Sequence, residues 1–142
     1  MATDAHELQG LRALVTGGTK GIGQAIAARL RESGATVLTT ARTAPDDSSG
    51  VDFVAADVAT ADGCRTVVEA VNRRFGGIDV IVHVVGGSSA PVGGFAVLDD
   101  REWQRALDLN LFGAVRLDRA LLPSMLEQCS GNSPLVQPRF SS

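Results

Sequence analysis

A glycine-rich turn near the start of the chain constrains the fold more than any other feature. A short apolar run over residues 11–16 leads into Gly17-Gly18-Thr19-Lys20-Gly21-Ile22-Gly23, and a segment of helical periodicity follows. Glycines between a strand and a helix let the backbone turn tightly and approach a pyrophosphate, while the helix N-terminus offers free N–H groups. The pattern indicates a dinucleotide-binding turn, and the alternative is an ordinary glycine-rich turn. A P-loop is excluded because no Gly-Lys-Ser/Thr triplet is present.

Apolar or β-branched runs alternate with helical patterns along the rest of the chain. Strands are expected at residues 11–16, 35–40, 51 to 55 or 56, and 78–85, and helices at 21–33, 61–75 and about 101–127, the last with a bend. The first helix should carry Ile22, Ile26, Ala27 and Leu30 on one face, and the last Leu107, Leu111, Ala114, Val115, Leu121, Leu122 and Met125. Thr60 should be the N-cap of the second helix, which ends at Gly76-Gly77, and the apolar face of that helix should be Cys64, Val67, Val68, Val71 and Phe75. This alternation predicts an α/β fold with a doubly wound parallel sheet in the order 3-2-1-4.

The end of the chain has a different character. Residues 128–142 contain two prolines and no periodicity, and proline is a poor member of an inner strand. We therefore expect a domain over residues 1–127 and an irregular tail over 128–142. The fourth strand then becomes an apolar edge of an incomplete sheet, which invites pairing with another chain.

Charge and composition exclude several classes of protein. The net charge is −3 without any block of lysine and arginine, so neither nucleic acid nor an anionic membrane is an expected partner. No stretch approaches the ~20 apolar residues of a membrane span, and the acidic N-terminus does not resemble a signal peptide. Cys64 and Cys129 lie far apart, which favours reduced thiols in a cytoplasmic protein. No cluster of histidine, cysteine and carboxylates predicts a metal site.

The glycine turn with its preceding Thr16 resembles the cofactor motif of the short-chain dehydrogenase/reductase family, which has a Rossmann fold and binds NAD(H) or NADP(H). Asp57-Val58 resembles the pair that contacts adenine, and Val84-Val85-Gly86 stands where the family usually has Asn-Ala-Gly. The match covers residues 8–127, about the first half of a family member. The resemblance implies that the cofactor is contacted by Gly17, Thr19, Lys20, Gly21, Ile22, Gly23, Arg42, Asp57, Val58, Val85 and Gly86.

The catalytic group of the family matches only in part. Asn110 resembles the asparagine of its Asn-Ser-Tyr-Lys group, but the chain has no tyrosine, and Lys20 is its single lysine. His83 and Val84 replace two asparagines of the family pattern. His83 is either a candidate base or, on the simpler interpretation, a strand-end residue that makes one hydrogen bond. We expect negligible turnover from these residues alone.

Two cofactors and three functions follow as hypotheses. NADP(H) is expected over NAD(H), because the second strand ends in Ala41-Arg42 with no carboxylate before Asp46, and Arg42 with Lys20 suits a 2′-phosphate. By family, the function is hydride transfer between this cofactor and a carbonyl or alcohol substrate. The alternatives are a non-catalytic nucleotide-binding or partner-binding remnant, and a truncated product. Homo-oligomers could form through the long helix or the fourth-strand edge, although packing on its own sheet equally explains that helix.

Overall fold

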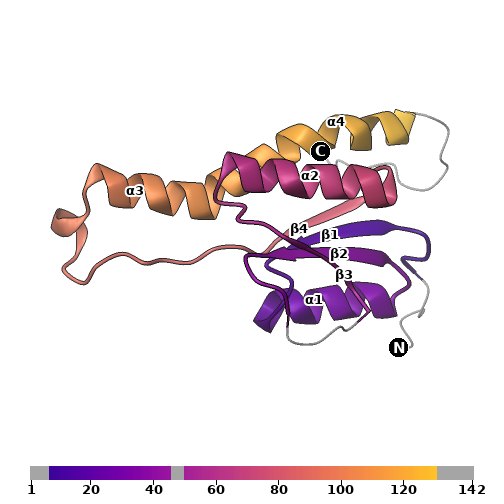
Figure 1. Ribbon diagram of the computed structural model, residues 1–142, viewed down its shortest axis with the longest axis horizontal. Helices are drawn as coiled ribbons and strands as arrows, with labels where there is room; N and C mark the ends of the chain where they lie inside the picture. The colour runs from indigo at the N-terminus through magenta and orange to yellow at the C-terminus, as the bar shows by residue number, and fades with distance from the viewer. Residues whose placement is uncertain (1–6, 46–49, 131–142) are drawn as a thin grey trace, which may run out of the picture.

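Four parallel strands form the sheet in the computed structural model, which describes residues 7–45 and 50–130 (Figure 1). They are β1 (Arg12–Thr16), β2 (Thr36–Ala41), β3 (Asp52–Ala55) and β4 (Val80–His83). The order β3-β2-β1-β4, with every pairing parallel, confirms the predicted α/β fold and its 3-2-1-4 topology. Within the described residues β4 is an edge strand, as expected.

Helices cover the two faces of the sheet unequally. Helix α1 (Gly21–Glu32) lies on one face, while α2 (Ala61–Phe75) and α4 (Gly113–Ser130) lie on the other (Figure 1). Successive side chains of a strand point to opposite faces, so β1 and β2 supply both cores. The core under α1 contains Ala13, Val15, Ala27, Ala35 and Val37, and the core under α2 and α4 contains Leu14, Leu38, Val67, Val71, Ile78, Leu117 and Leu121.

Helix α2 begins and ends where its sequence predicts. The Thr60 side chain accepts a hydrogen bond from the backbone N–H of Gly63 at 3.0 Å, which confirms it as the N-cap. Gly76 ends the helix in the left-handed region at φ +67°, where glycine avoids the steric penalty of a Cβ. The predicted apolar face is confirmed by the burial of Cys64, Val67 and Val71.

Strand β4 is shorter than the predicted run over residues 78–85. Its ladder with β1 ends where His83 pairs with Thr16, because β1 itself ends there. Beyond that point the backbone N–H groups of Val84 and Val85 donate to the Thr16 hydroxyl, at 3.1 and 3.5 Å. A side chain therefore replaces the ladder at the end of β4.

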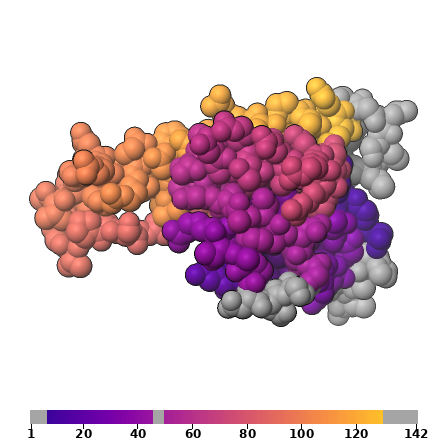
Figure 2. Space-filling view, in the orientation of Figure 1, coloured from indigo at the N-terminus to yellow at the C-terminus, as the bar shows by residue number. Residues whose placement is uncertain are grey.

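The long helix predicted over residues 101–127 is two helices joined by a π-turn. A 3₁₀ turn at Phe95–Val97 precedes α3 (Asp100–Leu107), and the π-turn Asp108–Phe112 leads into α4. The chain after β4 runs out from the sheet and returns through α3, which projects from the body (Figures 1 and 2). Helix α4 continues to Ser130, three residues past the helix end expected at about residue 127. The rest of the expected tail, residues 131–142, lies outside the described residues.

The predicted apolar faces are wrong in two places. In α1, Ile22 is the second residue of the helix and is 75% exposed. In α3, the π-turn and α4, four of the apolar residues expected on one face are exposed, namely Leu107, Leu111, Val115 and Leu122. Leu121 and the unpredicted Leu117 are buried instead, because α4 packs on α2 and the sheet through that side only.

Candidate functional site

The glycine turn, residues 17–23, is packed so closely that three of its positions exclude a side chain. The Gly17 N–H donates to the Thr40 carbonyl at 2.8 Å. A Cβ on Gly23 would lie 2.1 Å from the Gly17 carbonyl oxygen, and one on Gly18 would lie 2.6 Å from Thr39 Cγ2. One on Gly17 would meet Val85 Cγ2 at 3.2 Å, at a φ of +67°. These contacts hold the turn in a tight conformation that leads directly into α1.

The N-terminus of α1, which follows the glycine turn directly, is not covered by other residues at Gly21. Gly21 has φ +56°, and a Cβ placed there would meet nothing within 4 Å. Lys20 is the N-cap in extended conformation, and its side chain makes no capping hydrogen bond. The first-turn N–H groups therefore have no side-chain cap, and together with the positive end of the helix dipole they suit an anionic group.

Three other predicted segments meet at the same edge of the sheet. Arg42 follows β2, Asp57 and Val58 follow β3, and Val85 with Gly86 follow β4. All four strands are parallel, so their carboxyl ends lie on the side of the glycine turn, where ligands of open α/β sheets bind. The structure thus gathers the predicted cofactor residues around one edge.

The loop after β3, residues 57–60 and called here the β3 loop, is held by short local bonds. Asp57 Oδ1 accepts from the Ala59 N–H at 3.0 Å, and the Thr60 hydroxyl donates to the Asp57 carbonyl at 2.8 Å. Gly63 lies against it so closely that a Cβ would be 1.9 Å from the Asp57 carbonyl oxygen. One oxygen of the Asp57 carboxylate therefore stabilises the conformation of the β3 loop itself.

Asn110 clamps the backbone of Gly87 from both sides. Its Nδ2 donates to the Gly87 carbonyl at 2.8 Å, and its Oδ1 accepts from the Gly87 N–H at 2.9 Å. The same Nδ2 donates to the Ala106 carbonyl at 2.9 Å, in the last turn of α3. Every hydrogen bond recorded for the Asn110 side chain among the described residues is thus made to backbone. We call its two bonds to Gly87 the Asn110 clamp. Asn110 fixes the segment after β4 and is a positioning residue in this structure.

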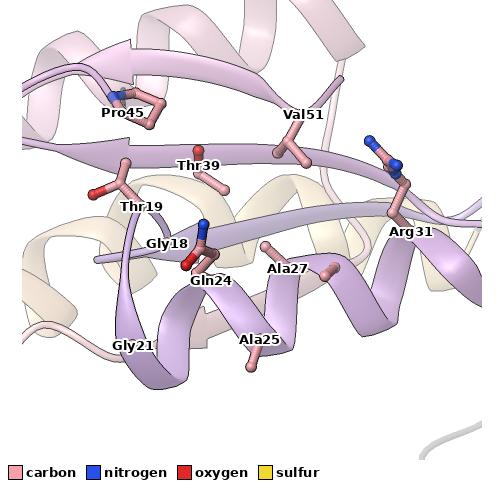
Figure 3. A pocket seen from close by; sticks show the side chains of 11 residues that line it. Gly18, Thr19, Gly21, Gln24, Ala25, Ala27, Arg31, Thr39, Pro45 and Val51 are labelled. Carbon is pink, nitrogen blue, oxygen red and sulfur yellow. The ribbon is translucent and has the colours of Figure 1, made fainter. Parts of the chain in front are cut away.

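A pocket of about 350 Å³ extends from the glycine turn along the side of α1 that faces β2 (Figure 3). Gln24 and Thr39 lie at its centre, and Arg31 lies at its far end. Its described lining is Gly18, Thr19, Gly21, Gln24, Ala25, Ala27, Ala28, Arg31, Thr39, Pro45 and Val51. Only Thr19 and Gly21 of the predicted site residues line it, so the predicted site lies mainly on the open edge above the pocket.

The two predicted phosphate cations are both exposed. Across residues 7–45 and 50–130, neither the Lys20 nor the Arg42 side chain has a recorded hydrogen bond or ion pair. Both side chains are therefore available to a ligand. The same described residues contain no group of three or more histidine, cysteine and carboxylate side chains placed to hold a metal.

Two side-chain contacts of the site region were not predicted from the sequence. Arg116 donates to the Ala59 carbonyl, and the Cys64 thiol donates to the Val58 carbonyl at 3.2 Å. Burial raises the pKa of Cys64, and Asp57 adds to this while Arg116 opposes it. No local sequence signal marks either residue, because each acts on backbone that is brought near by the fold.

His83 matches the simpler of its two interpretations. Its Nε2 lies 2.8 Å from Asp118 Oδ1, which joins the end of β4 to α4. This is the one hydrogen bond recorded for the His83 side chain among the described residues, as the strand-end interpretation predicts.

Comparison with known proteins decides the family. The family model described as short chain dehydrogenase matches residues 12–133. The chain belongs to the short-chain dehydrogenase/reductase family. A short chain dehydrogenase from Pseudocercospora fijiensis is 33% identical over 139 residues, covering 88% of this chain and 44% of that protein.

Two solved reductases have the same fold as this chain. The L-sorbose reductase from Gluconobacter frateurii complexed with NADPH and L-sorbose is 34% identical, with a TM-score of 0.77 over 89% of this chain and 51% of that one. The NADH-dependent reductase A1-R′ complexed with NAD is 29% identical, with a TM-score of 0.80 over 90% and 58%. The chain thus spans about half the length of the family members it matches.

No helix within the described segments is both long and apolar enough to cross a membrane.

Proposed function

We propose that this chain is the dinucleotide-binding part of a short-chain dehydrogenase/reductase and binds NADP(H) at the carboxyl edge of its sheet. In the family, the nicotinamide ring gives or takes a hydride, and the substrate is a carbonyl compound or an alcohol. The chain's own residues supply binding and orientation. Gly21 and the first turn of α1 would receive the pyrophosphate, the β3 loop the adenine, and Val85 with Gly86 the central part of the cofactor.

The open position at Gly21 carries this proposal. Gly17, Gly18 and Gly23 are glycines because protein atoms fill the space of a side chain, but Gly21 faces empty space at an uncapped helix N-terminus. A helix N-terminus with no side chain over its backbone lets a pyrophosphate approach the N–H groups closely.

A charge placed at this opening tests the proposal. Gly21→Asp puts a carboxylate where the pyrophosphate would lie, and NADPH binding followed by nucleotide fluorescence should be lost. Gly76→Asp is the matched control, because Gly76 has a similar positive φ of +67° and the same open surroundings but ends α2. Equal binding by both variants and the wild type would contradict the proposal.

The preference for NADP(H) rests on charge at the end of β2. Arg42 and Lys20 are exposed cations beside the turn, and the described residues 42–45 include no carboxylate to bond a ribose 2′-hydroxyl. An arginine can meet a 2′-phosphate by two parallel hydrogen bonds.

We also propose that the 142-residue chain does not turn over a substrate by itself. It contains no tyrosine, its single lysine lies in the glycine turn, and Asn110 is committed to the backbone of Gly87. Positioned acid–base groups typically contribute ~10²–10⁴-fold to a rate. Steady NADPH oxidation with any carbonyl of a broad panel, abolished by Asn110→Ala, would contradict this.

A second role, contact with another copy of the chain, is favoured by one observation. Leu111, Val115 and Leu122 are exposed and share a side of the π-turn and α4, whereas Leu117 and Leu121 are buried on another side. Light scattering would test it: Val115→Lys should shift an oligomer toward monomer, while Ala120→Lys, exposed but off this side, should not. A monomeric wild type would contradict this role.

A further inference from the structure

Arg116, the fourth residue of α4, binds two separate parts of the candidate site with one side chain. Its Nη1 donates to the Ala59 carbonyl of the β3 loop at 3.1 Å, and its Nη2 donates to Asp108 Oδ1 at 3.2 Å. The guanidinium also lies 5.6 Å from the ring centroid of Phe112. Asp108 and Phe112 are the two ends of the π-turn, so Arg116 holds both ends of this turn and the β3 loop together.

The π-turn carries the Asn110 clamp at its centre. Asn110 reaches from this turn to Gly87, on the segment after β4. A movement of the π-turn therefore moves the groups that fix Gly87. Gly86 is equally close, because a Cβ on it would lie 3.0 Å from Asn110 Oδ1.

The start of α4 also lies directly on the β3 loop. A Cβ on Gly113 would be 2.6 Å from the Val58 carbonyl oxygen, so helix and loop touch through backbone. The Cys64 thiol bonds this same carbonyl at 3.2 Å and lies 3.8 Å from the Gly113 carbonyl. The β3 loop and the start of α4 are thus closely packed. The Arg116 side chain connects them to the π-turn through its hydrogen bonds to Ala59 and Asp108.

We propose that Arg116 is a positioning residue that couples the adenine side of the nucleotide site to the Gly87 segment. The order of contacts is the β3 loop, Arg116, the π-turn, Asn110 and Gly87. Adenine that orders the β3 loop would then also order Gly87, although adenine does not touch it. The coupling of adenine to Gly87 rests on the proposed function. The positioning of Asn110 by Arg116 concerns the protein without ligand.

Arginine is required for this arrangement because two acceptors are held in different directions. The planar guanidinium presents separate N–H groups to Ala59 and Asp108 and a flat face to Phe112, whereas a lysine is a compact charge on a flexible stem. Arg116→Lys should keep the charge beside Asp108 and the fold, but lose the simultaneous bond to the loop.

The first arm of the test uses the protein without ligand. Amide hydrogen exchange at Gly87 and the side-chain amide resonances of Asn110 are compared in the wild type, Arg116→Gln and Arg116→Lys. Exchange at Gly87 should rise about three- to tenfold in both variants, the size expected for weakening one hydrogen-bonded contact. Arg119→Gln is the matched control, since Arg119 is exposed three residues further along α4. Unchanged exchange and resonances in folded Arg116→Lys would overturn the proposal.

The second arm uses adenosine 2′,5′-bisphosphate, which carries the adenine side and no nicotinamide. Its binding should slow exchange at Gly87 in the wild type and in Arg119→Gln, and this response should disappear in Arg116→Lys even at saturation. A response that persists in Arg116→Lys, or is absent from bisphosphate-bound wild type, overturns the coupling. Failure of the wild type to bind the bisphosphate would instead contradict the proposed function, and the ligand-free arm would still decide whether Arg116 positions Asn110.

Discussion

Arg12 and Asp79 form a two-pronged ion pair at the amino-terminal edge of the sheet, opposite the candidate site. Arg12 Nε donates to Asp79 Oδ2 at 2.9 Å and Nη2 donates to Oδ1 at 3.0 Å, while the Arg12 backbone N–H also donates to Oδ2. The same guanidinium reaches the Phe75 carbonyl at the end of α2 and the Gln128 side chain near the end of α4. One arginine thus joins β1, β4 and both helices of the α2–α4 layer.

This pair predicts a pH dependence of stability. Its hydrogen bonds with Arg12 lower the pKa of Asp79, so the ionised carboxylate favours the folded state. The contribution is fully present above the ordinary aspartate pKa of about 3.9 and is lost as pH falls through the lowered value. Urea unfolding at pH 7 should show Asp79→Asn less stable by about 1–3 kcal/mol, and the difference should shrink in acid.

The control for this measurement is Glu32→Gln. Glu32 pairs with Arg29 on the exposed side of α1 at 3.7 Å, and such surface pairs contribute about 0–1 kcal/mol. A gap between the wild type and Asp79→Asn that stays constant down to pH 2 would contradict the role of the ionised carboxylate.

Gly113→Ala should destabilise the protein, although alanine has a higher helix propensity than glycine. Alanine is better than glycine inside a helix by about 1 kcal/mol, but the new Cβ would lie 2.6 Å from the Val58 carbonyl oxygen. Overpacking of this kind typically costs about 1–3 kcal/mol. Thermal unfolding measures the net effect, and Ala120→Gly on the exposed side of α4 calibrates the propensity. A more stable Gly113→Ala protein would show that α4 does not touch the β3 loop as described.

The two cysteines should react with thiol reagents at very different rates. Cys129 is exposed, whereas Cys64 is 3% exposed and burial raises its pKa, so little reactive thiolate is present at neutral pH. A disulfide-exchange reagent should label one thiol rapidly and the second only with local or global unfolding. Cys129→Ser should remove the fast phase. Two equal fast phases in native protein would contradict the burial of Cys64 against the β3 loop and the start of α4.

Local sequence signals predicted the parts of the fold that depend on short segments. The glycine turn, the Thr60 cap and the Gly76 stop follow from residue type and spacing within a few positions, and the strand order follows from the alternation of strands and helices. The contacts that organise the site do not, because Asn110 with Gly87 and Arg116 with Ala59 are 23 and 57 residues apart in the chain. Asn110 itself was found by its resemblance to the family, but its bonds to Gly87 were not.

The wrong predictions have physical reasons of the same kind. Periodicity shows which residues of a helix share a side, but it does not show whether anything covers that side, as Leu111 and Val115 demonstrate. The end of β4 was placed too late because an apolar run does not show that the Thr16 hydroxyl takes over from the ladder. The end of α4 was placed too early because the bond between Gln128 and Arg12 joins residues 116 positions apart.

Calorimetric titration of NADPH and NADH onto the same protein tests the central claim most directly. The account predicts that NADPH binds more tightly, and that Arg42→Ala weakens NADPH by about tenfold while NADH changes little, because only NADPH carries the 2′-phosphate that a charge-assisted bond would hold. Arg73→Ala, an exposed arginine in the last turn of α2, should leave both affinities unchanged. Absence of binding, equal affinity for the two nucleotides, or tighter binding of NADH would contradict the account.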